Sequence, residues 1–379
     1  MKIVAKIFRI VNDHFQFLKR VLRSMKNGGG RIVSTFGFWK GSVAFAVAVV
    51  VLGMSGNASA ADLVVGAFGG IWERSFRECV VDPFQKETGK SVDIVLGSAP
   101  QWLNQIAANP TKPPLDVMMV ASDYAYDAIN RGLVDKFTIE RVPNLAKIAK
   151  RFTEVGDGYG VTHNYGSMGL IYNKATVPNP PKTWKEFVEG TVSGKWKSSA
   201  PSINYTGGGS AFIVYQLSTI YGGDIDNIGP GLAQAKRMLD SRNLTLWTDP
   251  NQVLNDLKSG EIDIAAYWDG RAWAFIDDGN AGFGYLTPAP GAIAGITWVQ
   301  KAKGSADLGF DFVNFALDAK RQSCFGSKVR YGTGNVDAVY DPAVAQEITK
   351  IDEIIIPPFK DLPPRQAKWL EQWNKELGR

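Results

Sequence analysis

Apolar and polar residues follow one another in a pattern that predicts short buried strands, each followed by a helix. The clearest early strand segments are 62–68, 91–96 and 115–120. In 75–88, Phe76, Val80 and Phe84 fall on one helical face, and Thr88-Gly89 is typical of a helix end. This alternation of strands and helices predicts an α/β fold with mainly parallel sheets.

The same pattern continues to the end of the chain. Further helices are predicted at 102–109, 124–131, 232–240, 253–258, 308–325 and 364–377. We expect Asp123 to cap the second of these, and Thr183 with Glu186 to form a capping box. Trp369 and Trp373, four residues apart on the last helix, are interpreted as packing residues.

One segment, 159–172, differs in character from the rest. It is long and strand-like, and it carries polar and aromatic residues together with three glycines. Such a segment suits a crossing between two lobes, where the backbone bends and side chains face a cleft.

The stretch 261–270 combines a predicted strand with side chains that are suited to binding a ligand. A run at 262–266 leads into Tyr267-Trp268-Asp269, and Gly270 separates it from a predicted helix at 271–276. An indole beside a carboxylate is suited to binding a small organic cation, because the ring face attracts the charge and the carboxylate accepts from an N–H donor. The alternative is that Trp268 is a core residue and Asp269 caps the helix.

The N-terminus has the order of a secretory signal. Lys40 precedes an apolar run from Val43 to Met54, and the small residues Ala58-Ser59-Ala60 follow it. We expect residues 1–60 to be a signal peptide that is cleaved after Ala60, which places the mature chain in the periplasm. The basic stretch from Met1 to Arg23 is long for such a signal, so translation from Met25 is an alternative to Met1.

Removing this leader changes the charge balance. The whole chain has a net charge of +5, but nine basic residues and one acid lie in 1–60, which leaves a net charge of about −3. The basic residues are scattered, so we expect no nucleic-acid partner.

Cys79 and Cys324 form a disulfide or remain two separate thiols. The exported part holds one histidine, His163, which argues against histidine-based catalysis or a histidine-rich metal site.

The glycine-rich motifs do not fit known catalytic or nucleotide-binding patterns. Residues 66–70 lack dinucleotide-binding spacing, and 207–210 precede a helix without a phosphate-loop lysine. The motifs of serine hydrolases, zinc proteases and thiol oxidoreductases do not occur. We therefore expect no enzyme, no cofactor and no metal. Aromatic residues do gather where strands end, at Phe68, Trp72, Tyr124, Tyr165, Trp268 and Tyr331.

A series of motifs resembles the family 1 solute-binding proteins of ABC importers. The motifs are 83–92, 116–120, 169–173, 183–187, 260–264 and 267–270, and they occur in the family's order. The branch that the chain resembles most is that of the spermidine/putrescine-binding proteins. The resemblance implies a two-lobed periplasmic-binding-protein fold of type 2, with a mainly parallel sheet in each lobe and the ligand cleft between the lobes.

The resemblance also implies how the mature chain is divided. Lobe one would comprise 61–163 and 268–335, and lobe two would comprise 164–267 and 336–379. On this division Cys79 and Cys324 fall in the same lobe, which favours the disulfide.

Ligand-binding positions follow from the same resemblance. The matching residues are Phe68, Gly69 and Gly70 after the first strand, Asp123 or Tyr124 after the third, Trp268 and Asp269, and Tyr331 and Thr333. One segment departs from the polyamine binders, because 204–210 contains no carboxylate for a second amine. Backbone N–H groups of Gly208, Gly209 and Ser210 would instead receive an anionic or neutral end of the ligand.

The resemblance implies a monomeric periplasmic component that captures a small amine-bearing solute, such as a polyamine, and delivers it to an ABC permease in the inner membrane. An alternative is a binder of a zwitterionic amine, such as an aminophosphonate, an opine or an amino acid derivative. A ferric-ion binder is disfavoured because no Tyr-Tyr pair occurs. An exported enzyme is disfavoured because no catalytic motif occurs.

Overall fold

We analysed a computed structural model of the chain. It describes residues 61–153, 156–205 and 210–378, and residues from Ala60 onward form one compact unit. The predicted signal peptide therefore lies outside the described residues. Within the described part, no helix is both long enough and apolar enough to cross a membrane.

The strands form one sheet in the order β2-β1-β3-β9-β4-β7-β5-β6. Their bounds are β1 Leu63–Ala67, β2 Val92–Leu96, β3 Val117–Ala121, β4 Val161–Asn173, β5 Ser198–Pro201, β6 Leu244–Trp247, β7 Ile264–Trp268, β8 Phe283–Leu286, β9 Ala292–Lys301, β10 Gly332–Thr333 and β11 Ile354–Ile355. At one end β1 pairs in parallel with β2 and β3, and at the other β5 pairs in parallel with β6 and β7. We call these three-strand groups the first half and the second half of the sheet.

Helices cover both halves. The α-helices are α3 Ile71–Phe76, α4 Asp82–Thr88, α5 Ala99–Ala108, α6 Ser122–Asn130, α7 Lys150–Thr153, α8 Trp184–Val192, α9 Leu217–Ile220, α10 Gly229–Asp240, α11 Pro250–Ser259, α12 Asp269–Asp277, α13 Leu308–Ala316, α14 Ala319–Val329 and α15 Gln366–Leu377. Two π-helical segments are η1 Arg77–Val81 and η3 Ser210–Gln216, and short 3-10 turns are η2 Pro143–Lys147, η4 Ala345–Glu347 and η5 Pro363–Arg365. The α/β class predicted from the pattern is confirmed.

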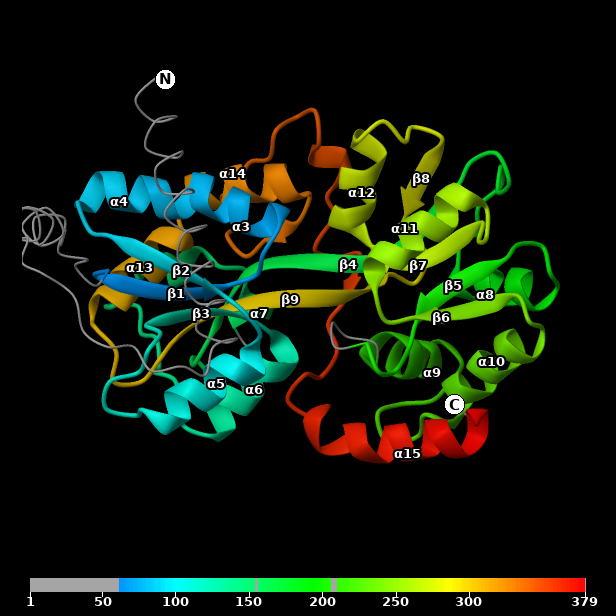
Figure 1. Cartoon of the computed structure of the whole chain (residues 1–379), viewed down its shortest axis with the longest axis horizontal. Coiled ribbons are helices and arrows are strands. Elements are labelled where there is room, and N and C mark those ends of the chain that lie inside the picture. Colours follow the sequence, from blue (N-terminus) through cyan, green and yellow to red (C-terminus); the bar gives the residue numbers. More distant parts are fainter. Residues whose placement is uncertain (1–60, 154–155, 206–209, 379) are drawn as a thin grey trace, which may run out of the picture. The chain divides into compact units, whose positions relative to one another are not determined.

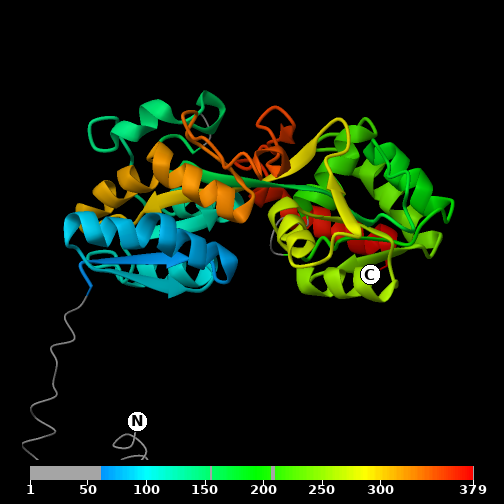
Figure 2. The same ribbon diagram turned by 90° about the horizontal axis from the view of Figure 1, so that it is seen from above.

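The two long strands β4 and β9 join the halves of the sheet. They pair antiparallel with each other, β9 continues onto β3, and β4 continues onto β7. Both views show them running from one group of helices to the other (Figures 1 and 2). The expected crossing segment 159–172 corresponds to β4, and its antiparallel pairing with β9 joins the mainly parallel strand groups expected for the two lobes into one mixed sheet.

A third segment, from the end of α14 to α15, accompanies these two strands. Its short strand β10 pairs with β4, and β11 pairs with β9. The segment then leads to α15, which packs against α10 beside the second half of the sheet (Figure 1). The chain thus crosses between the halves three times in the described part.

Two predicted helices are interrupted. The helix expected over 75–88 is divided into α3, η1 and α4, and Pro83 near the start of α4 removes a backbone donor at this point. Its predicted end is confirmed, since Gly89 adopts a left-handed conformation with φ 71°. The helix expected over 308–325 is two helices, because Asp318 accepts hydrogen bonds from the N–H groups of Lys320 and Arg321 and begins α14.

The caps show which local signals determine a helix start. The Thr183 hydroxyl accepts from the N–H of Glu186, and the Glu186 carboxylate accepts from the N–H of Lys182, so the capping box is confirmed with a one-residue shift. The expected cap at Asp123 is wrong. Helix α6 begins at Ser122, and its N-cap residue Ala121 has no side-chain hydrogen bond, because β3 runs directly into the helix.

Large aromatic residues fill the core. Trp369 and Trp373 on α15 are 2% and 1% exposed, which confirms their interpretation as packing residues. Trp184 and Phe212 meet edge-on in the second half, with ring centroids 5.2 Å apart.

Candidate functional site: an aromatic cavity at the crossing strands

A cavity of about 650 Å³ lies where the ends of strands from both halves meet. Residues that follow β1, β3 and β7 line it, together with the middle of β4 and β9. Open α/β sheets bind ligands at the carboxyl ends of their strands. The position and size of this cavity therefore suit a small organic ligand.

Two aromatic rings lie directly against the crossing strands. The indole of Trp268 is packed over Gly295 of β9 so closely that a Cβ there would be 2.7 Å from it. The ring of Tyr331 is packed over Gly166 of β4, where a Cβ would be 2.8 Å away. The Trp268 Nε1 donates to the hydroxyl of Tyr205 over 3.1 Å, which fixes the orientation of the indole. We call Trp268 and Tyr331 the aromatic wall.

Helix α12 presents one face to the cavity. Its residues Arg271, Ala274 and Phe275, and Asp278 directly after its end, have the spacing i, i+3, i+4 and i+7, and all four line the cavity. The charged residues of the described lining are therefore a cation and an anion at opposite ends of an apolar stripe. Seven residues of helix place their Cα atoms about 10 Å apart.

The Arg271 guanidinium is placed to receive an anion. It is exposed, and within 61–153, 156–205 and 210–378 it forms no ion pair with a carboxylate. Its positive charge acts on the nearby Tyr267 hydroxyl, which donates to the carbonyl of Pro250 over 2.8 Å. A guanidinium has several donors, so most remain available to a ligand.

The structure brings five of the predicted ligand-binding residues together in this cavity: Phe68, Gly69, Gly70, Trp268 and Tyr331. Trp72, noted as an aromatic residue after a strand, also lines it. Their common position reflects the topology, since β1 and β7 both end at this edge.

The other predicted residues lie elsewhere or are not described. Thr333 is 6% exposed, and its N–H and hydroxyl bond the hydroxyl of Tyr340 at 2.8 and 3.0 Å. Tyr124 lies in α6 and does not line the cavity. Gly208 and Gly209 fall outside the described residues. Asp123 lies in α6 and Ser210 begins η3, but their side chains are likewise not described.

Asp269 is placed behind the aromatic wall. Its side chain is 0% exposed and does not line the cavity. The carboxylate accepts from the Ser167 N–H and hydroxyl at 2.9 and 3.0 Å, from the Thr349 hydroxyl at 3.1 Å and from the Gly270 N–H at 2.8 Å. Burial raises the pKa of Asp269 to about 7, although these hydrogen bonds act to lower it.

Several cavity residues were missed at the sequence level. They are Ile71, Ala121, Ser122, Asn164, Gly166, Tyr205, Leu254, Gly270, Arg271, Ala274, Phe275, Asp278, 293–297, Val329, Phe359, Leu362 and Gln366. Helical periodicity after Gly270 is a signal that identifies Arg271 and Phe275 as residues on one face. The β9 and C-terminal residues carry no such local signal, because pairing far along the chain places them there.

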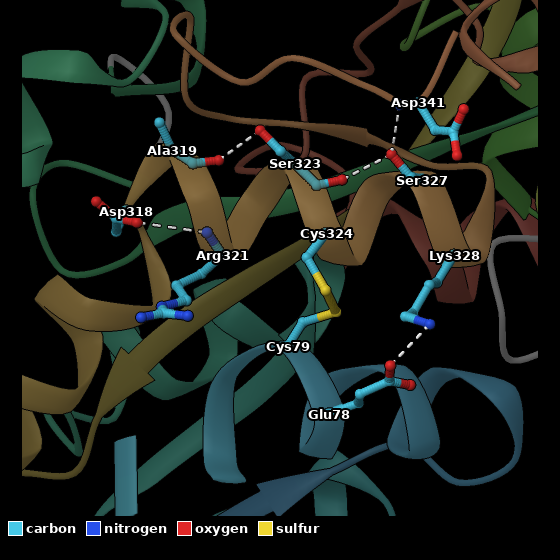
Figure 3. The surroundings of a disulfide bond; sticks show 10 residues. All are labelled: Glu78, Cys79, Asp318, Ala319, Arg321, Ser323, Cys324, Ser327, Lys328 and Asp341. Atoms are coloured by element: carbon cyan, nitrogen blue, oxygen red, sulfur yellow. Dashed lines mark hydrogen bonds and ion pairs between the residues drawn. A yellow bond between two sulfur atoms is a disulfide. The ribbon is translucent and has the colours of Figure 1, made fainter. Parts of the chain in front are cut away.

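A disulfide supports one side of the cavity. Cys79 in η1 and Cys324 in α14 are bonded, with Cα atoms 5.6 Å apart (Figure 3). Beside it, the Lys328 ammonium and the Glu78 carboxylate form an ion pair at 2.9 Å. The bond joins the helical segment that follows Phe68 to the helix that precedes Tyr331, so both parts of the lining are linked covalently.

The described residues contain no group of three or more histidine, cysteine, aspartate or glutamate side chains arranged to hold a metal ion. Within that part of the chain, the cavity offers aromatic faces, one cation, one anion and backbone groups. This arrangement can bind and orient a small polar molecule.

Comparisons with known proteins identify the family and agree with the fold. A family model described as bacterial extracellular solute-binding protein matches residues 80–350. The solved structure of an extracellular solute-binding protein from Bordetella parapertussis has a TM-score of 0.76 and 26% identity, covering 83% of this chain and 98% of that one. The protein AgtB from Agrobacterium tumefaciens R10, solved in complex with agropinic acid, has a TM-score of 0.64 and 22% identity, covering 84% and 99%.

One curated relative, the norspermidine sensor of Vibrio cholerae, is 24% identical over 119 residues. The match covers 31% of this chain and 33% of the sensor, so the chain spans about a third of the length of that relative.

Proposed function

Since this chain belongs to the bacterial extracellular solute-binding proteins, which capture small solutes for ABC permeases, we propose that its solute is a small amine with an anionic group at its other end. The observation that carries this proposal is the face of α12. Arg271 and Asp278 stand at opposite ends of the apolar stripe formed by Ala274 and Phe275.

Each part of such a solute finds a matching group. A carboxylate or phosphonate accepts charge-assisted hydrogen bonds from Arg271, which Lys could not reproduce in a forked geometry. An ammonium group is attracted by the faces of the aromatic wall and by the Asp278 carboxylate. The methylene chain between them lies on Phe275 and Ala274.

A polyamine is the second candidate. The aromatic lining favours it, and the norspermidine sensor is a relative over part of the chain. Arg271 opposes it, because an uncompensated cation in the lining repels a ligand with several positive charges. Asp269 does not compensate for this, since its oxygens are already occupied by protein donors.

Calorimetric titration of the mature protein distinguishes these candidates. We expect ε-aminocaproate or γ-aminobutyrate to bind near micromolar affinity, about −8 kcal/mol, and norspermidine and putrescine to bind more weakly. Arg271→Gln should weaken binding of these amino acids by roughly 1.5–3 kcal/mol and should strengthen binding of the polyamines. Arg237→Gln is the matched control, because Arg237 pairs with Glu189 on the surface outside the cavity.

The opposite ranking, with polyamines bound tightly and Arg271→Gln without effect, would establish the polyamine reading. Recovery of chemically altered solute would instead identify an exported enzyme. Simple one-to-one binding with unchanged solute supports the transport role.

We also propose that the mature chain begins at Ala61 in the periplasm and acts as a monomer. Residues 61–163 with 268–335 would move as one lobe and residues 164–267 with 336–379 as the other, closing over the solute. N-terminal sequencing of the exported protein tests the cleavage, and a start elsewhere than Ala61 contradicts it. Small-angle scattering with and without solute tests the closure and the monomer.

A further inference from the structure

The aromatic wall is supported from behind by one short piece of chain. Thr349 bonds the carboxylate of Asp269, the neighbour of Trp268. Glu347 pairs at 2.7 Å with the guanidinium of Arg330, the neighbour of Tyr331. Both wall residues are therefore anchored, through an adjacent residue of the chain, to residues 347–349, which we call the strap.

The strap is also tied to the crossing strand β4. The Ser167 and Thr349 hydroxyls are 2.7 Å apart, and the Tyr165 hydroxyl donates to the carbonyl of Thr349 over 3.1 Å. Thr349 and Tyr285 also line a second cavity of about 550 Å³. The strap therefore lines this cavity and bonds, through Asp269 and Arg330, to the neighbours of two residues that line the first one. We call the strap together with Ser167 and Asp269 the layer.

Three oxygens in this layer form a closed triangle. The Asp269 carboxylate oxygen lies 3.0 Å from the Ser167 hydroxyl and 3.1 Å from the Thr349 hydroxyl, and the hydroxyls are 2.7 Å apart. When Asp269 is ionised, only the Ser167 and Thr349 hydroxyls carry protons for the three contacts. The arrangement that stabilises the carboxylate most has both hydroxyls donating to it. When Asp269 is protonated, the carboxyl group itself donates one hydrogen bond of the triangle. The two hydroxyls are then free to donate to each other or to other acceptors.

On the premise that the cavity is the solute site, we propose that Asp269 is a positioning residue that holds the aromatic wall to the strap when ionised, and releases it in part when protonated. Solute affinity then depends on pH, although Asp269 does not touch the solute. Charge-assisted hydrogen bonds are roughly twice as strong as neutral ones, which gives the ionised form the tighter link.

Asp269 is the group in this layer that titrates near neutral pH. The titratable groups that face it are Tyr165 of β4, Tyr285 of β8 and Tyr331 after α14, and burial raises the pKa of each phenol, so all three stay neutral. On the adjoining segments, Arg330 pairs with both Glu347 and Asp277, each at 2.7 Å, and Arg271 on α12 faces the cavity. Burial raises the pKa of Asp269 itself to about 7.

The positioning role is tested without any solute. Protein labelled with fluorotryptophan gives a fluorine NMR signal for Trp268, assigned by its loss in Trp268→Phe. We expect this signal to shift with pH about a midpoint near 7, and to lose that shift in Asp269→Asn. In Thr349→Val the midpoint should move upward by roughly one pH unit, because the ionised carboxylate loses a donor.

Thr191→Val is the matched control. It removes the hydroxyl of another fully buried threonine, which bonds Phe187 and Trp196 in the second half. Its Trp268 signal should keep the wild-type midpoint. A pH-independent Trp268 signal, or a shift that persists in Asp269→Asn, overturns the proposal. Because Thr349→Val retains the carboxylate, it decides the matter even if Asp269→Asn does not fold.

The effect on solute affinity is measured with ε-aminocaproate, whose charges stay constant between about pH 6 and pH 8. We expect its Kd to rise at least threefold from the higher to the lower pH in the wild-type protein, and to stay constant in Asp269→Asn. A pH-independent Kd in a protein that binds ε-aminocaproate contradicts the positioning role. Absence of binding at either pH contradicts the proposed solute class instead, and the fluorine signal still decides the role of Asp269.

Discussion

The two residues of the aromatic wall come from different parts of the molecule, and they are held in different ways. Tyr331 follows α14, which is joined to η1 by the Cys79–Cys324 disulfide beside the first half of the sheet. In the second half, Trp268 follows β7, and neither of the chain's two cysteines lies there. Its support comes from the hydrogen bond that its indole donates to Tyr205 and from the hydrogen bonds that Asp269 accepts.

This difference separates a fixed side of the cavity from an adjustable one. A covalent bond between two helices limits how far Tyr331 moves relative to Phe68. The Trp268 side depends on hydrogen bonds whose strength varies with protonation and with the residues that donate them. Four substitutions test this division, and they are ordered by the size of the expected effect.

The largest effect is expected in the second half, at α15. Trp373→Ala removes a side chain that is 1% exposed, so the free energy of unfolding should fall by about 3–5 kcal/mol. Urea unfolding monitored by circular dichroism measures it. Lys375→Ala on the exposed face of the same helix is the control, and a loss of equal size there would mean that α15 is unstable for another reason.

The second largest loss of stability is expected when the disulfide is removed. The double variant Cys79→Ala with Cys324→Ala is expected to lose roughly 2–5 kcal/mol of stability, because the unfolded chain regains the freedom of a loop of 245 residues. Thermal unfolding with and without a reductant makes the same comparison in the wild-type chain. If the variant is as stable as the wild type, the first half is not fixed by this bond.

Deprotonation of the buried Asp269 should lower the free energy of unfolding as the pH rises. Its pKa is about 7 in the folded chain against an ordinary value of 3.8 for a free aspartate, so between these values the folded state binds the proton more tightly than the unfolded state. The contribution of this group is therefore full at low pH and falls across that window, by at most about 1.4 kcal/mol per pH unit.

Unfolding measured from pH 4 to pH 8 in the wild type and in Asp269→Asn isolates this contribution. The difference between the two profiles should level off above about pH 7. A constant difference across the range would show that the carboxylate does not change its protonation there.

The smallest effect is expected at a helix cap. Thr183→Ala removes the hydroxyl that accepts from Glu186, and we expect a loss of about 1 kcal/mol. Thr183→Ser keeps the acceptor and should restore most of the stability. If serine fails to restore it, packing of the threonine methyl group is the cause.

Local patterns predicted most of the elements, because the apolar periodicity of a strand or a helix extends over only a few neighbouring residues. The breaks in two helices were missed, since Pro83 and Asp318 interrupt an otherwise continuous apolar face. The pairing of β4 with β9 was missed for a different reason. It joins segments more than a hundred residues apart, and neither segment shows its partner in its own sequence.

The candidate site was predicted in part for the same physical reasons. Phe68 and Trp268 were found because each ends a buried strand, and strand ends gather at one edge of the sheet. Asp269 was expected to bind the ligand because it adjoins Trp268. At the end of a strand, however, successive side chains point to opposite sides, so the indole reaches the cavity while the carboxylate lies behind it.

The two glycines beneath the aromatic wall give the chain a simple means of changing what it carries. Trp268 and Tyr331 rest on Gly295 and Gly166, where a single methyl group would meet the rings at less than 3.0 Å. Alanine at either position would push a ring toward the solute and shorten the space available to it. One-carbon changes in the floor of the cavity can therefore alter the size of the accepted solute while every side chain that touches it stays the same.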